Sequence, residues 1–172
     1  MTGKAIAAAL AAAVALTVET TPAGRTQSAW ERLQFLVGTW DSSENTQLGP
    51  AQGSTSFTTE LGGRVIVRRS FADYGTDRSR PRHDDLLVVY REAEESPLRA
   101  IYFDSEGHVI HYAVSAPAEN KAVFQSDDAG SPPGPRYRLS YERAGSHLNG
   151  VFDVAPPGGD YKTYLSWTSV KR

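Results

Sequence analysis

The chain has 172 residues, a length that suits one domain, and its 18 basic and 20 acidic side chains leave a net charge of −2. No basic stripe runs along it, which argues against nucleic acid as a partner. Charged residues at 22% and hydrophobic residues at 40% fit a folded domain, and the lack of cysteine excludes disulfides, thiolate metal sites and a cysteine nucleophile.

The first segment has the layout of a secretory signal. Lys4 precedes an uninterrupted apolar run from Ala5 to Leu16, and small residues follow near Ala23. The run is too short for a helix that spans a bilayer, which needs about 20 apolar residues. We therefore expect cleavage near Ala23 and export to the periplasm or the medium. The expected divisions are a signal peptide over residues 1–23, a linker over 24–29 and one domain over 30–172.

One helical segment is expected next, over residues 29–37. Trp30, Leu33 and Val37 recur there at helical spacing. Because the segment is short, we expect it to plug one end of the fold and not to form a core helix.

The rest of the chain consists of short stretches that alternate polar and apolar residues or are rich in β-branched and aromatic ones, divided by turn residues. Consecutive strands with no helices between them indicate an antiparallel meander. Closure removes exposed strand edges, so an all-β closed barrel is the predicted fold. The ten predicted strands cover residues 38–47, 51–61, 63–73, 84–92, 97–104, 108–116, 120–127, 135–143, 146–154 and 161–171.

Two short motifs carry a family resemblance. The start of the first strand, LQFLVGTW over Leu33–Trp40, and the LGGR turn at Leu61–Arg64 resemble the Gly-x-Trp signature and following turn of the calycin superfamily, in particular its bacterial lipocalin-like domains of unknown function. The resemblance implies a barrel whose tryptophan plugs the closed end, often against a basic side chain of the last strand. Trp40 would then be structural, with Lys171 or Arg172 beside it.

Alternation predicts which side chains of the last three strands face the interior. In each strand an apolar set opposes a polar one, and the apolar set belongs inside. The inward residues are expected to be Tyr137, Leu139 and Tyr141, then Leu148, Gly150, Phe152 and Val154, then Tyr161, Leu165 and Trp167.

The third and fourth strands are harder to orient. Alternation places Val67 and Phe71 inside, and Arg69 shares their parity. A buried guanidinium without a partner is costly. Arg69 would therefore need an internal carboxylate, for which Glu44 is one candidate, or an anionic ligand. The fourth strand is apolar on both faces, so the side on which Tyr90 lies stays open.

Residues 97–116 are predicted to form a hairpin with a two-residue turn at Glu106 and Gly107. The more apolar face of this hairpin is expected inside. The opposite orientation, which also stays open, would bring Tyr102, Asp104 and His111 into the cavity as a polar cluster. The residues expected inside are Arg99, Ile101, Phe103, Ile110, Tyr112 and Val114.

The four histidines do not predict a metal site. His83 lies in a basic stretch expected to be solvated, His108 and His111 face opposite sides of one strand, and His147 points outward. Haem-binding members of the resembled superfamily use a histidine near the end of the barrel, and the closing strand over 161–171 has none. We therefore expect no metal, no cofactor and no catalytic constellation.

The remaining candidate site is the barrel interior. Aromatic walls with a few polar groups are typical of a ligand cavity. They predict a non-catalytic protein that binds a small apolar or amphipathic molecule. Two alternatives stay open: a barrel enzyme, such as an isomerase or cyclase, that uses tyrosine, arginine and cavity shape, and a structural envelope domain with a filled interior. The residues expected to line the cavity are Arg69, Phe71, Tyr90, Tyr112, Tyr137, Tyr141 and Trp167.

Overall fold

The computed structural model describes residues 27–46, 49–74, 82–127 and 134–172, without the side chains of residues 43–46, 49 and 50. The expected export signal over residues 1–23 lies outside the described residues, and so does the side chain of Glu44. None of the helices in the described part is long and apolar enough to cross a membrane.

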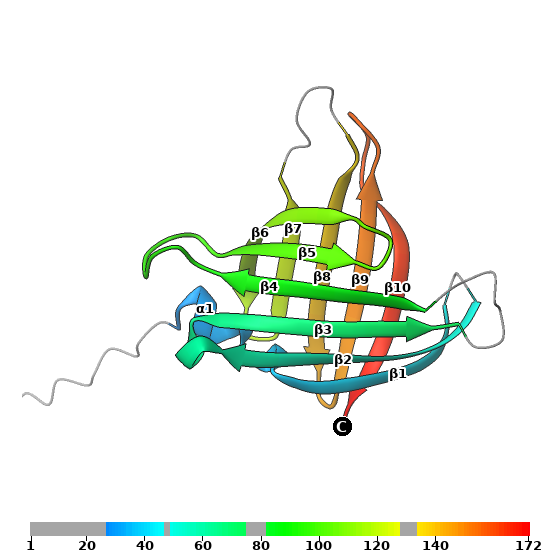
Figure 1. Ribbon diagram of the computed structural model, residues 1–172, viewed down its shortest axis with the longest axis horizontal. Coiled ribbons are helices and arrows are strands. Elements are labelled where there is room, and N and C mark those ends of the chain that lie inside the picture. Colours follow the sequence, from blue (N-terminus) through cyan, green and yellow to red (C-terminus); the bar gives the residue numbers. More distant parts are fainter. Residues whose placement is uncertain (1–26, 47–48, 75–81, 128–133) are drawn as a thin grey trace, which may run out of the picture.

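Within the described residues, ten antiparallel strands close into a barrel, which confirms the predicted fold class. Each strand pairs with the next in the chain, and the last pairs with the first. Figure 1 shows β1 to β5 crossing β7 to β10 at a steep angle. The strands are β1 (Gly38–Thr46), β2 (Gly49–Glu60), β3 (Val65–Asp73), β4 (His83–Tyr90), β5 (Arg99–Asp104), β6 (Val109–Ala118), β7 (Lys121–Ser126), β8 (Arg136–Ala144), β9 (His147–Ala155) and β10 (Lys162–Lys171).

The predicted helical segment is a turn of α-helix, α1 (Ala29–Arg32), that continues as a 3-10 turn, η1 (Leu33–Leu36). A capping box starts it: the Ser28 hydroxyl accepts the Glu31 N–H, and the Glu31 carboxylate accepts the Ser28 N–H at 2.7 Å. Arg32 Nε donates to the Ala116 carbonyl at 2.7 Å, which holds α1 on β6. Leu33 and Leu36 are fully buried, so the segment plugs the barrel as predicted.

Trp40 is fully buried beside this plug, and its indole N–H donates to the Leu36 carbonyl at 2.8 Å. Of the two basic residues proposed to accompany it, Lys171 lies over the ring, whereas Arg172 is paired with Asp41. A side chain at Gly38, where φ is +134°, would meet Lys171 Cε at 3.0 Å. The glycine two residues before Trp40 therefore makes room for the lysine.

Above the plug, aromatic rings fill the core. Tyr141 stands edge-on to three others, with centroid distances of 5.5 Å to Phe57, 6.2 Å to Phe124 and 5.9 Å to Trp167. Gly150 allows this packing, because a Cβ there would lie 2.2 Å from the Trp167 ring. The inward orientation predicted for Tyr141 and Trp167 is confirmed.

The orientation predicted for Val67, Arg69 and Phe71 on β3 is wrong, because all three lie on the outer face. Arg69 shows this most clearly. Its side chain is 63% exposed and pairs with Glu60 on the outer surface, whereas Arg68 points inward and is buried. Arg68 lies opposite Phe57 of β2 and Leu87 of β4, both buried. Apolar residues occupy both faces at the start of β3, so cross-strand pairing sets the inner face here, and alternation within the strand could not.

On β4 the inner residues are Leu87 and Val89, both fully buried. Tyr90 has the opposite parity and faces outward, which corrects its assignment to the cavity. The start of β10 departs from prediction as well. A bulge between Thr163 and Leu165 reverses the parity, and Tyr161 packs outside, with Arg138 Cζ 4.3 Å from its ring centroid.

The β5–β6 hairpin has a longer turn than predicted. Asp104 accepts the Gly107 N–H and pairs with His108 across a three-residue turn, with Gly107 at φ +90°. The extra residue shifts the register by one, so Tyr102 lies opposite Ile110. Ile110, Tyr112 and Val114 are inside as predicted, but on β5 the inward residues are Ala100, Tyr102 and Asp104 in place of Arg99, Ile101 and Phe103.

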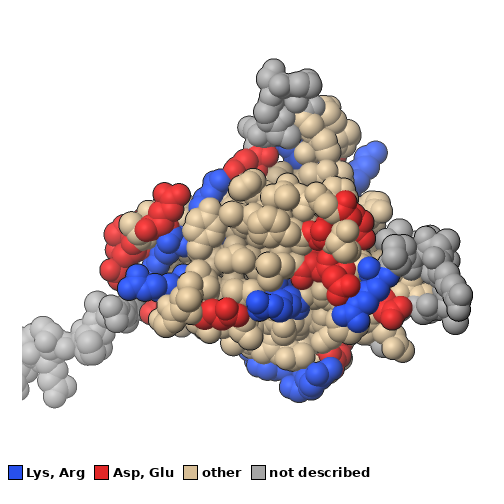
Figure 2. All heavy atoms as spheres, viewed as in Figure 1, with Lys and Arg blue, Asp and Glu red and all other residues tan. Residues whose placement is uncertain are grey.

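The outer surface carries both signs of charge, and Figure 2 shows them interspersed over the face in view. Exposed pairs link neighbouring strands, such as Lys121 with Glu142 at 3.0 Å. Because each exposed pair contributes at most about 1 kcal/mol, the stability of the barrel rests on its interior.

Candidate functional site

A cavity of about 610 Å³ lies inside the barrel, between the aromatic core and the end at which β4 begins and β5 ends. Its walls are mostly apolar and aromatic, and its rim is polar. The main apolar lining residues are Ile110, Tyr112, Tyr137, Leu139, Tyr141, Phe152, Leu165 and Trp167.

Five of the seven residues expected at the site line this cavity: Phe71, Tyr112, Tyr137, Tyr141 and Trp167. Phe71 does so only at the edge and not as predicted, because it has the parity of Arg69 and pairs with the exposed Asp84. Its ring lies on the outer face of β3, with the guanidinium of Arg82 3.9 Å from its centroid. Arg69 and Tyr90 do not line it, since both lie on the outer face of their strands.

A buried ion pair stands in the cavity wall, and the sequence analysis missed it. The side chains of Arg68 and Asp85 are 5% and 8% exposed and are hydrogen-bonded to each other. Arg68 Nη1 also donates to the Tyr141 hydroxyl at 2.5 Å. Burial raises the pKa of Asp85, but the charge of Arg68 and the hydrogen bond from His83 outweigh burial and hold the pKa below its usual value. Both groups of the pair are therefore charged at neutral pH.

His83 joins this pair to the rim. Its Nε2 lies 3.2 Å from the Tyr102 hydroxyl and 3.5 Å from Asp85 Oδ2, and its Nδ1 lies 2.8 Å from Glu106 Oε2. The hydrogen bond to Asp85 raises the pKa of His83, burial opposes it, and the charge of Glu106 adds to the rise. The histidine that the sequence suggested was solvated is thus half-buried among carboxylates.

Asp104, the last residue of β5, is held by the turn that follows it. Its Oδ1 accepts the backbone N–H groups of Glu106 at 3.1 Å and His108 at 2.8 Å, and its Oδ2 lies 2.9 Å from His108 Nδ1. Burial raises the pKa of Asp104, but the hydrogen bonds from His108 outweigh burial and lower it. Asp104 is therefore a fixed carboxylate at the rim.

Three tyrosines of the cavity stay protonated. Burial raises the pKa values of Tyr112 and Tyr141. Burial is also the main cause of the raised pKa of Tyr102, and the negative charge of Asp85 adds to it. Each can offer a neutral hydroxyl to a ligand or a neighbour.

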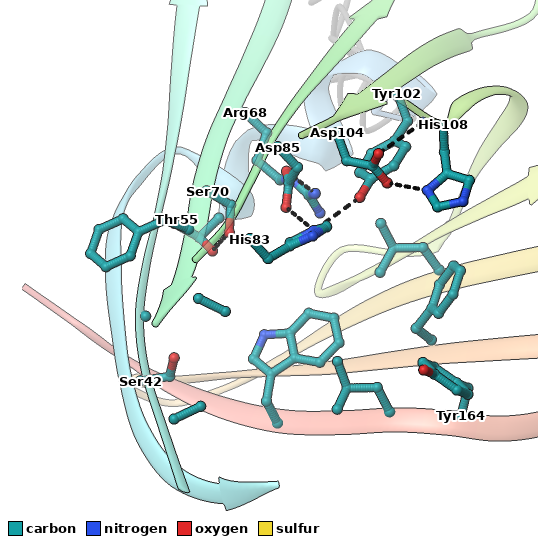
Figure 3. Close-up of a pocket in the computed structure, with 18 of the residues that line it drawn as sticks. Ser42, Thr55, Arg68, Ser70, His83, Asp85, Tyr102, Asp104, His108 and Tyr164 are labelled. Atoms are coloured by element: carbon teal, nitrogen blue, oxygen red, sulfur yellow. Dashed lines mark hydrogen bonds and ion pairs between the residues drawn. The ribbon is translucent and has the colours of Figure 1, made fainter. Parts of the chain in front are cut away.

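Figure 3 shows the polar side chains converging from β3, β4 and β5 on one side of the cavity, with aromatic and apolar side chains facing them. The carboxylates of Asp85, Asp104 and Glu106 outnumber the guanidinium of Arg68 by two charges when the histidines are neutral. The arrangement can hold an uncharged or cationic polar group at the rim and an apolar body deeper inside.

A signal for this cluster was present in the sequence. His83 and Asp85 are two residues apart on one strand, and so are Tyr102 and Asp104, which places each pair on one face. The orientation left open for the 97–116 hairpin did bring Tyr102 and Asp104 inside. His111 is exposed on the outer face, because the register shift separates it from them.

Comparison with models of known protein families and with curated protein sequences finds no match.

Proposed function

We propose that this protein binds one small apolar or amphipathic molecule inside its barrel. The observation that carries the proposal is the cavity of about 610 Å³, which falls within the 300–1,000 Å³ range of ligand pockets and has aromatic walls and a one-sided polar rim. A structural domain with a filled interior would not have this space.

The ligand need not be an acid. Arg69, for which the sequence suggested an anionic partner, is exposed and pairs with Glu60. The arginine that does face the interior, Arg68, is neutralised by Asp85. The excess of carboxylates at the rim disfavours a ligand with a negatively charged head group. We expect a neutral or cationic head group near His83 and Tyr102, with the apolar body against Tyr137, Phe152 and Trp167.

Two further inferences accompany this one. We infer that the chain is a lipocalin-like member of the calycin superfamily; a closed meander barrel, an N-terminal plug and Trp40 packed against Lys171 of the last strand support this. We also infer export after removal of residues 1–23, supported by the composition of that segment. N-terminal sequencing of protein secreted from a bacterial host tests the second inference, and an intact Met1 in the secreted pool would contradict it.

The binding experiment uses three molecules with the same tail: dodecanol, dodecylamine and dodecanoic acid. Displacement of a naphthalene fluorophore from the protein should rank the alcohol and the amine above the acid. Ile110→Trp, which fills the cavity, should weaken all three at least about tenfold, because a large side chain takes the place of the ligand's apolar body.

The matched control is Ile101→Trp, which adds the same ring to the outer face of β5, opposite His111. It should bind as the parent does. Equal binding by parent, Ile110→Trp and Ile101→Trp would place the ligand outside the cavity and refute the proposal.

A second candidate is a barrel enzyme that uses general acid–base chemistry. The contact that favours it is His83 Nε2 at 3.2 Å from the Tyr102 hydroxyl, inside a cavity. A polarised histidine–tyrosine pair can move a proton within a bound molecule, as an isomerase or cyclase requires. Recovery of each bound compound unchanged by mass spectrometry, after prolonged incubation with a panel of unsaturated alcohols and ketones, would count against it.

A further inference from the structure

Three side chains at the rim offer ligand atoms to one point. His83 starts β4, Asp104 ends β5 and Glu106 lies in the turn after it. One nitrogen or oxygen atom from each lies within 4.8 Å of the other two, and all three residues line the cavity. Asp104 and Glu106 are two residues apart, whereas His83 is about twenty residues away, so the pairing of β4 with β5 brings the histidine to the two carboxylates.

We propose that His83, Asp104 and Glu106 bind a divalent transition-metal ion, of the zinc class, at the rim of the cavity. One imidazole and two carboxylates are donors that zinc accepts, at about 2.0–2.2 Å each. Tetrahedral ligands at that distance lie about 3.4 Å from each other. The separation of 2.8 Å between His83 Nδ1 and Glu106 Oε2 is close to this value, and a small rotation of the exposed glutamate would open it.

The groups around His83 orient it for this role. Its Nε2 faces the Asp85 carboxylate and the Tyr102 hydroxyl, which leaves Nδ1 directed toward Glu106. A metal-bound histidine usually has its second ring nitrogen held by a carboxylate in this way. Asp85 is itself fixed by Arg68, so the orienting group is buried and rigid.

Asp104 is also held in place. Two backbone N–H groups fix one of its oxygens, and His108 contacts the other. The two lone pairs of Oδ1 are used by these backbone groups, so Oδ2 is the oxygen that keeps a lone pair for a metal. His108 therefore stands beside the three ligands as a positioning residue, in view in Figure 3.

Charge favours a cation at this point. With Asp85 paired to Arg68, the cluster keeps the two charges of Asp104 and Glu106. A divalent ion would neutralise both, whereas a proton on His83 neutralises one. Three protein ligands leave a coordination position open for water or a ligand atom. The proposal is independent of the proposed binding function, since it needs no organic ligand.

The test is a calorimetric titration of the full chain, treated with chelator and then dialysed, with zinc chloride. One ion per chain is expected, together with a rise in melting temperature. His83→Ala should weaken zinc binding at least about 100-fold, and Glu106→Gln should do the same without disturbing the barrel, because Glu106 lies in a surface turn. Cobalt(II) added in place of zinc should give visible absorption bands of a low-symmetry site in the parent and not in either variant.

His111→Ala is the matched control, since His111 is exposed on the outer face of the neighbouring strand. It should bind zinc as the parent does. Absence of binding by the parent at millimolar zinc, or equal losses in Glu106→Gln and His111→Ala, would overturn the proposal. If His83→Ala fails to fold, the zinc affinity of Glu106→Gln tests the proposal by itself. The dodecyl-chain titrations are run without metal, so failure of one proposal leaves the other standing.

Discussion

Lys171 lies over the ring of Trp40, with its Nζ 5.4 Å from the ring centroid, and the two residues are direct partners across β1 and β10. The first and last strands of the barrel therefore meet at this contact. A cation over an indole ring contributes about 1 kcal/mol at a partly exposed site. The burial of Trp40 itself contributes more, because the whole side chain leaves water.

We expect Trp40→Ala to lower the free energy of unfolding by about 3–5 kcal/mol, since it leaves a cavity at the closed end of the barrel. Lys171→Met should lower it by only about 1 kcal/mol. Urea denaturation measures both values. A Trp40→Ala protein that unfolds at the parent's urea concentration but no longer binds the dodecyl compounds would show that Trp40 contacts the ligand.

The buried pair of Arg68 and Asp85 gives a second prediction. Arg68→Met alone should destabilise by about 3–5 kcal/mol, because the buried Asp85 loses its guanidinium partner and keeps only the contact with His83. The double variant Arg68→Met with Asp85→Leu should be as stable as the parent or more stable, because it removes both buried charges. It also removes Arg68 Nε, which is buried without an acceptor among the described residues and therefore costs stability in the parent.

The neighbouring arginine is the control for this pair. Arg69 is exposed with an exposed partner, so Arg69→Met should change stability by less than about 0.5 kcal/mol. Thermal melts of the four proteins complete the comparison. Equal losses for Arg68→Met and Arg69→Met would mean that the two side chains have been assigned to the wrong faces.

Gly150 is predicted to set the position of Trp167. A Cβ at this position would lie 2.2 Å from the indole ring, so Gly150→Ala must push the ring into the cavity. We expect a loss of about 1–3 kcal/mol in stability, as for other overpacked sites. Dodecanol affinity should fall in the same variant, because the displaced ring takes up ligand volume. Unchanged tryptophan fluorescence and unchanged dodecanol affinity would contradict this.

Alkaline pH should unfold the barrel through its buried tyrosines. The pKa values of Tyr112 and Tyr141 are raised in the folded state, so above the ordinary tyrosine pKa of about 10 the unfolded chain loses protons that the folded chain keeps. Stability is therefore complete below pH 10 and falls as the pH rises past it.

The absorbance of tyrosinate at 295 nm measures this. Part of the signal should appear only with the loss of the far-ultraviolet circular dichroism of the barrel, and Tyr112→Phe should reduce that part. Complete ionisation of all tyrosines near pH 10 in a protein that is still folded would show that Tyr112 and Tyr141 are accessible to solvent.

The sequence by itself determined the type of fold and most of β8 and β9. Alternation in these strands is clear, because Tyr137, Leu139 and Tyr141 oppose charged neighbours, and a period of two places each set on one face. The plug could also be predicted, from the helical spacing before Gly38 and Trp40. These signals come from residues close together in the sequence, so they can be recognised without a structure.

Only the tertiary structure decided which polar side chains meet in the cavity. The start of β3 and residues 86–90 of β4 are apolar on both faces. Alternation therefore does not distinguish Arg68 from Arg69, whereas pairing with Phe57 and Leu87 does. On β5 one extra residue in the turn before His108 reversed the face. A register shift of one residue exchanges the inward and outward side chains of a whole strand. The register is set by contacts between strands, and the sequence of one strand alone does not reveal those contacts.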